Sequence, residues 1–193
     1  MLKARSLVSA ILGSVLLLSA VGALAPAGAN PGAPASVALV RGGSGTIPYT
    51  GGTTTLPLVI LDVANLGAAT VQIGYDRSVI SPTACARGAD FTGDNFVWIC
   101  NRFYDEDEDG LPDAVRIVST ALHGISATAG LPLNLAAIAW TLQGAQAPGQ
   151  VITLEVSAPT LADSDAVPIP HLTENGQIVL APVYFLHLPL VMR

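Results

Sequence analysis

Short apolar segments divided by turn-forming residues are the feature that most constrains the fold of this chain. Between residues 35 and 181 the apolar segments are about six to nine residues long, and clusters such as YTGGT, GADFTGDN and GAQAPG separate them. TVQIGYD alternates cleanly, with Val71, Ile73 and Tyr75 on one face, which is the period of a half-buried strand. No capped segment shows the 3.6-residue period of a helix. The sequence therefore predicts an all-β sandwich or jelly roll.

The predicted strands are placed by their apolar residues and by the turns that bound them. TLPLVILD (55–62) is continuously apolar, as expected for a strand buried on both faces or crossing a core. LAAIAWTLQ (135–143) is ambiguous because alanine also suits helices, but Trp140 and Gly144 favour a strand. The complete set of predicted strands is 35–41, 55–62, 70–76, 95–100, 114–121, 135–143, 150–158 and 176–181.

Residues 1–29 have the layout of a secretory signal peptide. Lys3 and Arg5 precede the apolar run LVSAILGSVLLLSAVGAL, and small residues at 27–29 match a cleavage site. An uncleaved membrane anchor is the alternative, since the apolar run approaches the roughly 18 residues that span a bilayer. The glycine and serine residues within this run disfavour an anchor. We expect a protein that is secreted or held at the cell surface, with no transmembrane span after cleavage. Its predicted parts are a signal peptide (1–29), a leader (30–35), a sandwich (36–181) and an apolar tail (182–193).

Charge excludes some classes of partner. After cleavage the chain has no lysine, and its net charge becomes more negative than −6, because Lys3 and Arg5 are lost and no acid is. An acidic chain without a basic stripe does not attract nucleic acid or anionic lipid.

The tail VYFLHLPLVMR (183–193) is too short to span a bilayer. Pro182 and Pro189 limit the ladder hydrogen bonds that it can form. Two interpretations stay open: a last edge strand or strap over the sandwich, and a sorting or surface-attachment signal.

Cys85 and Cys100 are the two cysteines. Export favours a disulfide between them, with a structural role; two buried thiols are the alternative. Their spacing is not the C-x-x-C of a redox enzyme.

Six carboxylates lie within nine residues, in the acidic loop 105–113 (DEDEDGLPD), whereas the rest of the chain holds only eight. Three aspartates at alternating positions, then Gly110 for a sharp turn, follow the template of a calcium loop, which supplies hard oxygen ligands. The twelfth position, where a bidentate glutamate would close the site, is Arg116. The missing ligand would come from Asp90, Asp94 or water, and a merely solvated acidic turn is the alternative. The predicted calcium ligands are Asp105, Asp107, Asp109, Leu111 through its carbonyl, and Asp113.

No catalytic motif is found, and we expect no enzyme. His123, His171 and His187 lie in separate segments without a metal-binding spacing. The chain lacks G-x-S-x-G, and RGGSGT lacks the lysine of a phosphate-binding loop.

Three segments, taken in order, resemble cohesin domains: GGTTTLPLVILDVANLGAATVQIGYDRSVISP (51–82), LAAIAWTLQG (135–144) and LADSDAVPIPHLTENGQIVL (161–180). The resemblance covers residues 36–181 and implies a nine-stranded jelly-roll β-sandwich related to carbohydrate-binding modules. In cellulosomes such domains bind dockerins, the calcium-loaded modules that enzymes carry. This chain differs in its two cysteines, which bracket an insert, and in the calcium-type loop inside the domain.

The resemblance implies a secreted, non-catalytic module that binds another extracellular protein, such as a dockerin, and that calcium and a disulfide stabilise. Two alternatives stay open. One is a carbohydrate-binding module linked to polysaccharide degradation, for which Trp98 and Tyr104 form the only aromatic cluster near the acidic loop. The other is a structural cell-envelope protein without a discrete ligand.

Overall fold

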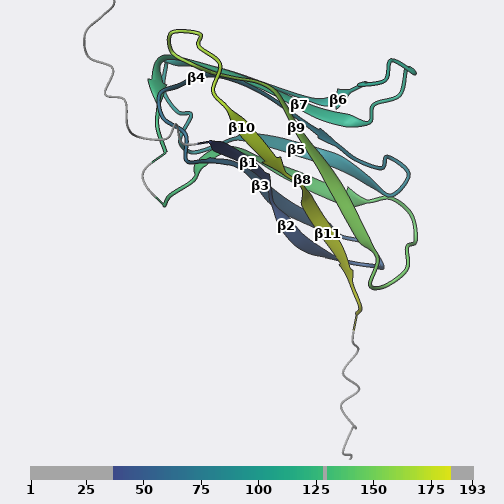
Figure 1. Cartoon of the computed structure of the whole chain (residues 1–193). Helices are drawn as coiled ribbons and strands as arrows, with labels where there is room; N and C mark the ends of the chain where they lie inside the picture. Colours follow the sequence, from purple (N-terminus) through teal and green to yellow (C-terminus); the bar gives the residue numbers. More distant parts are fainter. Residues whose placement is uncertain (1–36, 128–129, 184–193) are drawn as a thin grey trace, which may run out of the picture. The chain divides into compact units, whose positions relative to one another are not determined.

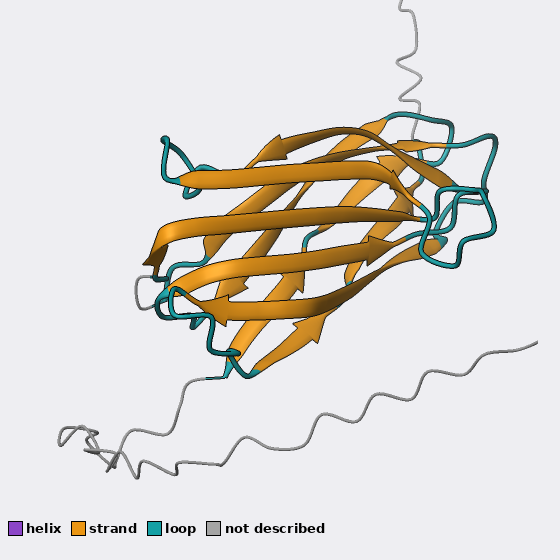
Figure 2. Ribbon diagram, turned by 90° about the horizontal axis from the view of Figure 1, so that it is seen from above, coloured by secondary structure: helices purple, strands orange, loops and turns teal. Residues whose placement is uncertain are grey.

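Two stacked β-sheets form the fold of this protein (Figure 1). The computed structural model describes residues 37–127 and 130–183. These residues contain strands and loops but no helix (Figure 2). The strands are β1 (Ala38–Gly42), β2 (Ser44–Pro48), β3 (Thr53–Leu61), β4 (Leu66–Gly74), β5 (Ile80–Arg87), β6 (Phe96–Tyr104), β7 (Ala114–Ile125), β8 (Leu133–Leu142), β9 (Val151–Asp163), β10 (His171–Glu174) and β11 (Gly176–Ala181). The predicted all-β class is confirmed.

The predicted signal peptide (1–29), the leader (30–35) and nearly all of the tail (182–193) lie outside the described residues. Among the residues that the structure describes, no helix is long and apolar enough to cross a membrane.

The strands form a five-stranded sheet in the order β10-β1-β3-β8-β5 and a six-stranded sheet in the order β2-β11-β9-β4-β7-β6. Most neighbours are antiparallel, but β1 pairs with β10 and β2 pairs with β11 in parallel. Alternate residues of the strands point into the space between the sheets, as β9 shows with buried Ile152, Leu154 and Val156 between exposed neighbours. Trp140 of β8 lies fully buried in this core. The ambiguous segment 135–143 is therefore a strand, as predicted.

Both the first and the last strand segments cross from one sheet to the other. The chain passes from β1 to β2 at Gly43, and from β10 to β11 at Asn175. A Cβ atom on Gly176 would lie 2.5 Å from the carbonyl oxygen of Gly43, and one on Gly42 would lie 2.7 Å from the backbone nitrogen of Gly176. The two crossings therefore require residues without side chains, because the backbones approach too closely for a Cβ.

The structure has eleven strands where nine were expected. Each crossing divides one extended segment into two strands, so joining β1 to β2 and β10 to β11 gives nine segments. Strand β5 falls outside all predicted strands, and β6 and β9 run several residues past their predicted ends. Segment 55–62 is fully buried on one face only, because Pro57 is exposed between buried Leu56 and Leu58.

A disulfide joins Cys85 of β5 to Cys100 of β6, with the two Cα atoms 6.5 Å apart. Strand β5 is the edge of the five-stranded sheet and β6 is the edge of the six-stranded sheet. The bond therefore links the two sheets along one side of the sandwich, and the predicted pairing is confirmed. A disulfide also indicates a setting outside the reducing cytoplasm.

Replacing both cysteines with alanine should lower the free energy of unfolding by about 3 kcal/mol, because the bond closes a loop of 15 residues in the unfolded chain. Urea unfolding of the two proteins measures this difference. A reductant should weaken the original protein and leave the double variant unchanged. Equal unfolding free energies would show that the disulfide contributes nothing.

Candidate functional site

The acidic loop connects β6 to β7, and backbone hydrogen bonds close its base. The amide of Asp113 donates to the carbonyl of Tyr104 at 3.1 Å, and the amide of Tyr75 donates to the carbonyl of Asp113 at 2.9 Å. The loop is thus fixed to the end of β4 as well as to its own hairpin. This position follows from the sheet order, which places β4 next to β7.

Four carboxylates of the acidic loop accept hydrogen bonds from amides of the same loop. Gly110, at φ +86°, makes the predicted sharp turn. One carboxylate oxygen each from Asp105, Asp107 and Asp109 lie within 4.8 Å of one another. The hydrogen bonds run from Gly110 N to Asp105 Oδ2 (2.7 Å), from Asp109 N to Asp107 Oδ1 (3.2 Å), from Leu111 N to Asp109 Oδ1 (2.8 Å) and from Glu106 N to Asp113 Oδ1 (2.9 Å).

Arg77, in the turn after β4, supplies a positive charge to this loop. Its Nη2 donates to Asp109 Oδ2 at 2.9 Å, and its Nη1 donates to Asp109 Oδ1 at 3.3 Å and to the carbonyl of Leu111 at 3.1 Å. These hydrogen bonds from Arg77, followed by the one from the Leu111 amide, lower the pKa of Asp109. The same ion pair raises the pKa of Arg77. Part of the negative charge of the loop is therefore neutralised within the chain.

The residues fit a calcium ion in part. Asp105, Asp107 and Asp109 are brought together, and Asp105 Oδ1 is buried without a hydrogen-bond partner in the described part of the chain. Asp113 is not a member of this group, and the carbonyl of Leu111 accepts from Arg77.

The suggestion that Asp90 or Asp94 supplies the missing ligand is wrong. Both precede β6, whereas the acidic loop follows it. The nine residues of β6 extend over about 30 Å at roughly 3.3 Å per residue. Asp90 instead accepts hydrogen bonds from the backbone amide and the side-chain amide of Asn134, at 2.7 and 3.1 Å.

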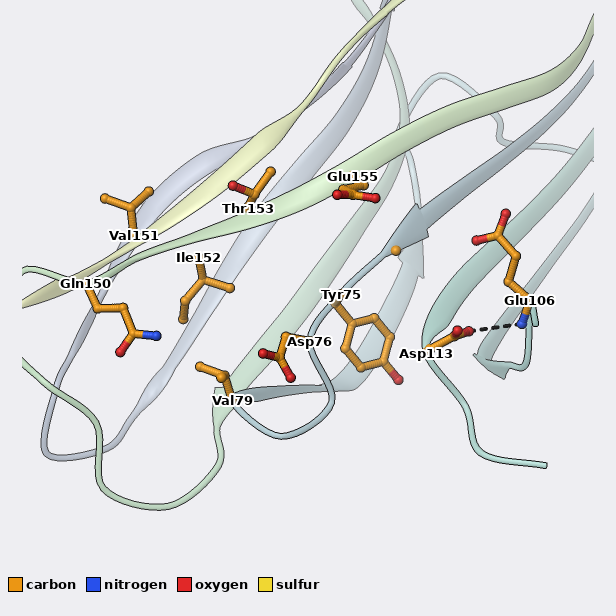
Figure 3. A pocket seen from close by; sticks show the side chains of 11 residues that line it. Tyr75, Asp76, Val79, Glu106, Asp113, Gln150, Val151, Ile152, Thr153 and Glu155 are labelled. Atoms are coloured by element: carbon orange, nitrogen blue, oxygen red, sulfur yellow. Dashed lines mark hydrogen bonds between the residues drawn. The ribbon is translucent and has the colours of Figure 1, made fainter. Parts of the chain in front are cut away.

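A pocket of about 440 Å³ lies beside the acidic loop (Figure 3). The ring of Tyr75 lies in it between Asp76 and Asp113 (Figure 3) and packs edge-on against Trp140, with ring centroids 5.3 Å apart. Burial, and then the charge of Asp113, raise the pKa of the Tyr75 phenol. The pocket is lined by Gly74, Tyr75, Asp76, Val79, Glu106, Asp113, Gln150, Val151, Ile152, Thr153 and Glu155.

Strand β6 carries two exposed apolar side chains on the outer face of the six-stranded sheet, here called the β6 apolar stripe: Val97 and Ile99. Their exposed fractions are 59% and 58%. Trp98 and Cys100, which alternate with them, face inward and pack against the core. Exposed large apolar residues that cluster on one strand mark an interaction surface more than single ones do.

Neither tryptophan forms an exposed platform for a sugar ring. Trp140 is fully buried, and Trp98 is half-buried, with its indole nitrogen donating to the carbonyl of Leu135 at 3.0 Å. Tyr104 accepts a hydrogen bond from Arg116, whose guanidinium lies over the Tyr104 ring. These contacts count against the carbohydrate-binding alternative.

The histidines form no site within the described residues. His171 is half-buried, and its two ring nitrogens lie 2.8 Å from the carbonyl oxygens of Ile169 and Ala158. His171 therefore links the start of β10 to the preceding segment and to β9. His123 is exposed on β7, and His187 lies outside the described residues.

No known protein family matches the sequence, and no curated protein matches it significantly. Solved structures, however, match its fold. A non-cellulosomal cohesin from the archaeon Archaeoglobus fulgidus is 14% identical with a TM-score of 0.59, and the match covers 77% of this chain and 93% of that one. The solution structure of a cohesin from Clostridium acetobutylicum is 20% identical with a TM-score of 0.59, over 76% of this chain and 92% of that one. This class of fold is the cohesin-type jelly-roll sandwich.

A type I cohesin–dockerin complex from Clostridium thermocellum matches in the same way, at 14% identity and a TM-score of 0.59, over 79% of this chain and 99% of that one. The chain therefore has the fold of cohesin domains, and the predicted resemblance is confirmed for the fold.

Replacing Arg77 with glutamine should raise the pKa of Asp109 toward its ordinary value. At neutral pH the ion pair stabilises the folded loop, and this contribution is lost as the pH falls through the lowered pKa of Asp109, because protonation removes the negative charge. Carboxyl carbon NMR titration of both proteins measures the change.

Asp76 is the internal control in that titration. Its pKa is lowered mainly by hydrogen bonds from the hydroxyl and amide of Ser78, at 2.6 and 2.9 Å. It should therefore titrate almost unchanged in the Arg77→Gln variant. Equal shifts of Asp76 and Asp109 would contradict a specific Arg77–Asp109 pair.

Proposed function

We propose that this chain is a secreted, non-catalytic module that binds another extracellular protein, with a dockerin-type module as the partner. The cohesin fold and an exposed apolar surface on one of its sheets support this proposal. Solved proteins with this fold include cohesins in complexes with dockerins.

The β6 apolar stripe is the observation that carries the proposal. It projects from the outer face of the six-stranded sheet, and Leu122 of the neighbouring β7 is 74% exposed. A regular strand presents these side chains without the entropy cost of ordering a loop on binding. Apolar anchors with a surrounding polar rim are typical of the energetic centre of a protein interface.

Ile99→Asp should weaken capture of the partner by about tenfold or more, as expected for a charge placed at the centre of an apolar interface. The test immobilises the full secreted chain, exposes it to the secreted proteins of its native host and identifies the captured protein by mass spectrometry. Binding of that purified protein to both variants is then measured.

Leu172→Asp is the matched control. Leu172 is 65% exposed on β10 of the opposite sheet, so the same substitution there should leave capture unchanged. Equal effects of the two substitutions, or no specific capture at all, would overturn the assignment of the β6 apolar stripe as the binding surface.

We also propose that the acidic loop binds calcium as a structural stabiliser. Asp105, Asp107 and Asp109 would hold the ion, and the buried, unpartnered Asp105 Oδ1 supports this role. The ion would provide the positive charge that the loop still lacks beyond Arg77. Because Arg77 now contacts Asp109 and the Leu111 carbonyl, it would compete with the ion for those two groups.

Calcium should therefore stabilise the protein against urea. With the ~1 mM affinity that is common in extracellular modules, about 10 mM calcium adds about 1.4 kcal/mol to the free energy of unfolding. Asp105→Asn should abolish this gain, Arg77→Gln should enlarge it, and Glu108→Gln in the same loop should preserve it. An unfolding free energy that is equal in calcium and in chelator would contradict the proposal without affecting the β6 apolar stripe.

A further inference from the structure

A groove with carboxylates on both sides runs across the six-stranded sheet next to the acidic loop. The pocket of about 440 Å³ and an adjoining one of about 270 Å³ share Gly74, Glu106 and Glu155. The two pockets together are called the acidic trough here. Figure 3 shows Glu155 on β9 and Glu106 in the loop after β6, with Asp113 beside Glu106 and Asp76 on the other side of the Tyr75 ring.

Strand pairing explains why the sheet is hollowed here. Gly74 lines both pockets and is paired with Glu155 of β9. The sheet therefore has no side chain at the position beside Glu155. Glu155 is exposed, whereas its neighbours Leu154 and Val156 face the core, so its carboxylate stands on the outer face of the sheet. This is the sheet that carries the β6 apolar stripe.

Among the described residues, no basic side chain lines the acidic trough. Two arginines of this sheet and its turns have other partners: Arg77 pairs with Asp109, and Arg116 stacks on Tyr104 and donates to its hydroxyl. Within the described ranges, Glu106 and Glu155 have no hydrogen-bonded or ion-paired side-chain partner for their carboxylates. The described part of the chain therefore leaves the negative charges of Glu106 and Glu155 without a counter-charge.

Part of the lining of the acidic trough is apolar. Val79, Ile152 and the ring of Tyr75 line the larger pocket (Figure 3). Among the described residues, the only group of acids close enough to hold a metal ion is Asp105, Asp107 and Asp109, which lies outside the trough. Carboxylates that are spread along a groove with an apolar wall suit a long side chain, whose methylene groups lie on the wall while its charged end meets the acids.

We propose that the acidic trough receives an arginine or lysine side chain of the partner protein, on the same sheet as the β6 apolar stripe. The proposal rests on the proposed protein-binding function and adds the chemistry of the partner: a surface with an apolar part and a separate basic residue. Complementary charge of this kind selects the partner and speeds its association more than it adds affinity.

A small cation tests the acidic trough without the partner. N-acetyl-arginine amide and N-acetyl-lysine amide are titrated into the full chain labelled with ¹⁵N, and N-acetyl-citrulline amide is the neutral control. The cationic amides should shift the backbone signals of Gly74, Tyr75 and Glu155, and added salt should reduce these shifts. The citrulline compound should leave the signals in place.

Glu106→Gln and Glu155→Gln should each weaken binding of the cationic amides by about twofold to fivefold, as expected for a partly exposed ion pair. Glu108→Gln is the matched control, because it removes the same charge from the same loop at a residue that does not line the trough. It should leave the affinity unchanged.

Equal effects of all three variants would show that the cation responds to the general negative charge of the protein, and this would overturn the proposal. Shifts from the citrulline compound, or no shifts from the cationic amides, would overturn it as well. The proposed protein-binding function can fail independently, because its test is the loss of partner capture in Ile99→Asp.

Discussion

Burial of alternate residues between two sheets is the interaction on which the other features of this protein depend. Because side chains alternate between the two faces of a strand, a shift of one residue in the pairing would move every core residue to the surface. The buried set Ile152, Leu154 and Val156 therefore fixes the register of β9 and, with it, the outward position of Glu155. The same constraint on β6 turns Trp98 inward and leaves Val97 and Ile99 exposed. The alternation of side chains along each strand therefore determines both which residues form the core and which residues form the candidate binding surface.

Much of this arrangement could be predicted from local sequence, and the failures have physical reasons. Trp140 and Gly144 favour a strand for segment 135–143 despite its alanines, and the structure agrees. Strand β5 was missed because ISPTACAR combines proline and alanine without an alternating apolar pattern; its place is set by pairing with β8. The hydrogen bonds inside the acidic loop connect residues at most seven apart, so sequence spacing can anticipate such a turn. Arg77 could not be anticipated, since it reaches Asp109 only because β4 lies next to β7.

The negative charge of this region is divided between two environments. In the acidic loop, carboxylates are turned onto nearby amides and onto Arg77, so much of their hydrogen-bonding capacity is used within the chain. In the acidic trough, Glu106 and Glu155 face an open groove instead. The tertiary structure distinguishes these two groups of carboxylates. Arg77 reaches Asp109 in the acidic loop, whereas Glu106, which lies beside the same acids in the sequence, faces the trough. Net charge alone would have treated them as equivalent.

The parallel pairing of the terminal strand segments also determines how this fold would carry mechanical load. Strand β1 begins beside the start of β10, and β11 ends beside the end of β2, so the chain enters and leaves the sandwich at opposite ends. Tension between these two points would draw the paired segments past each other in shear. The ladder hydrogen bonds of both pairs would then be strained together instead of opening one at a time. A module built this way resists stretching along its own axis, and its lifetime under tension is governed by the rate of forced unfolding.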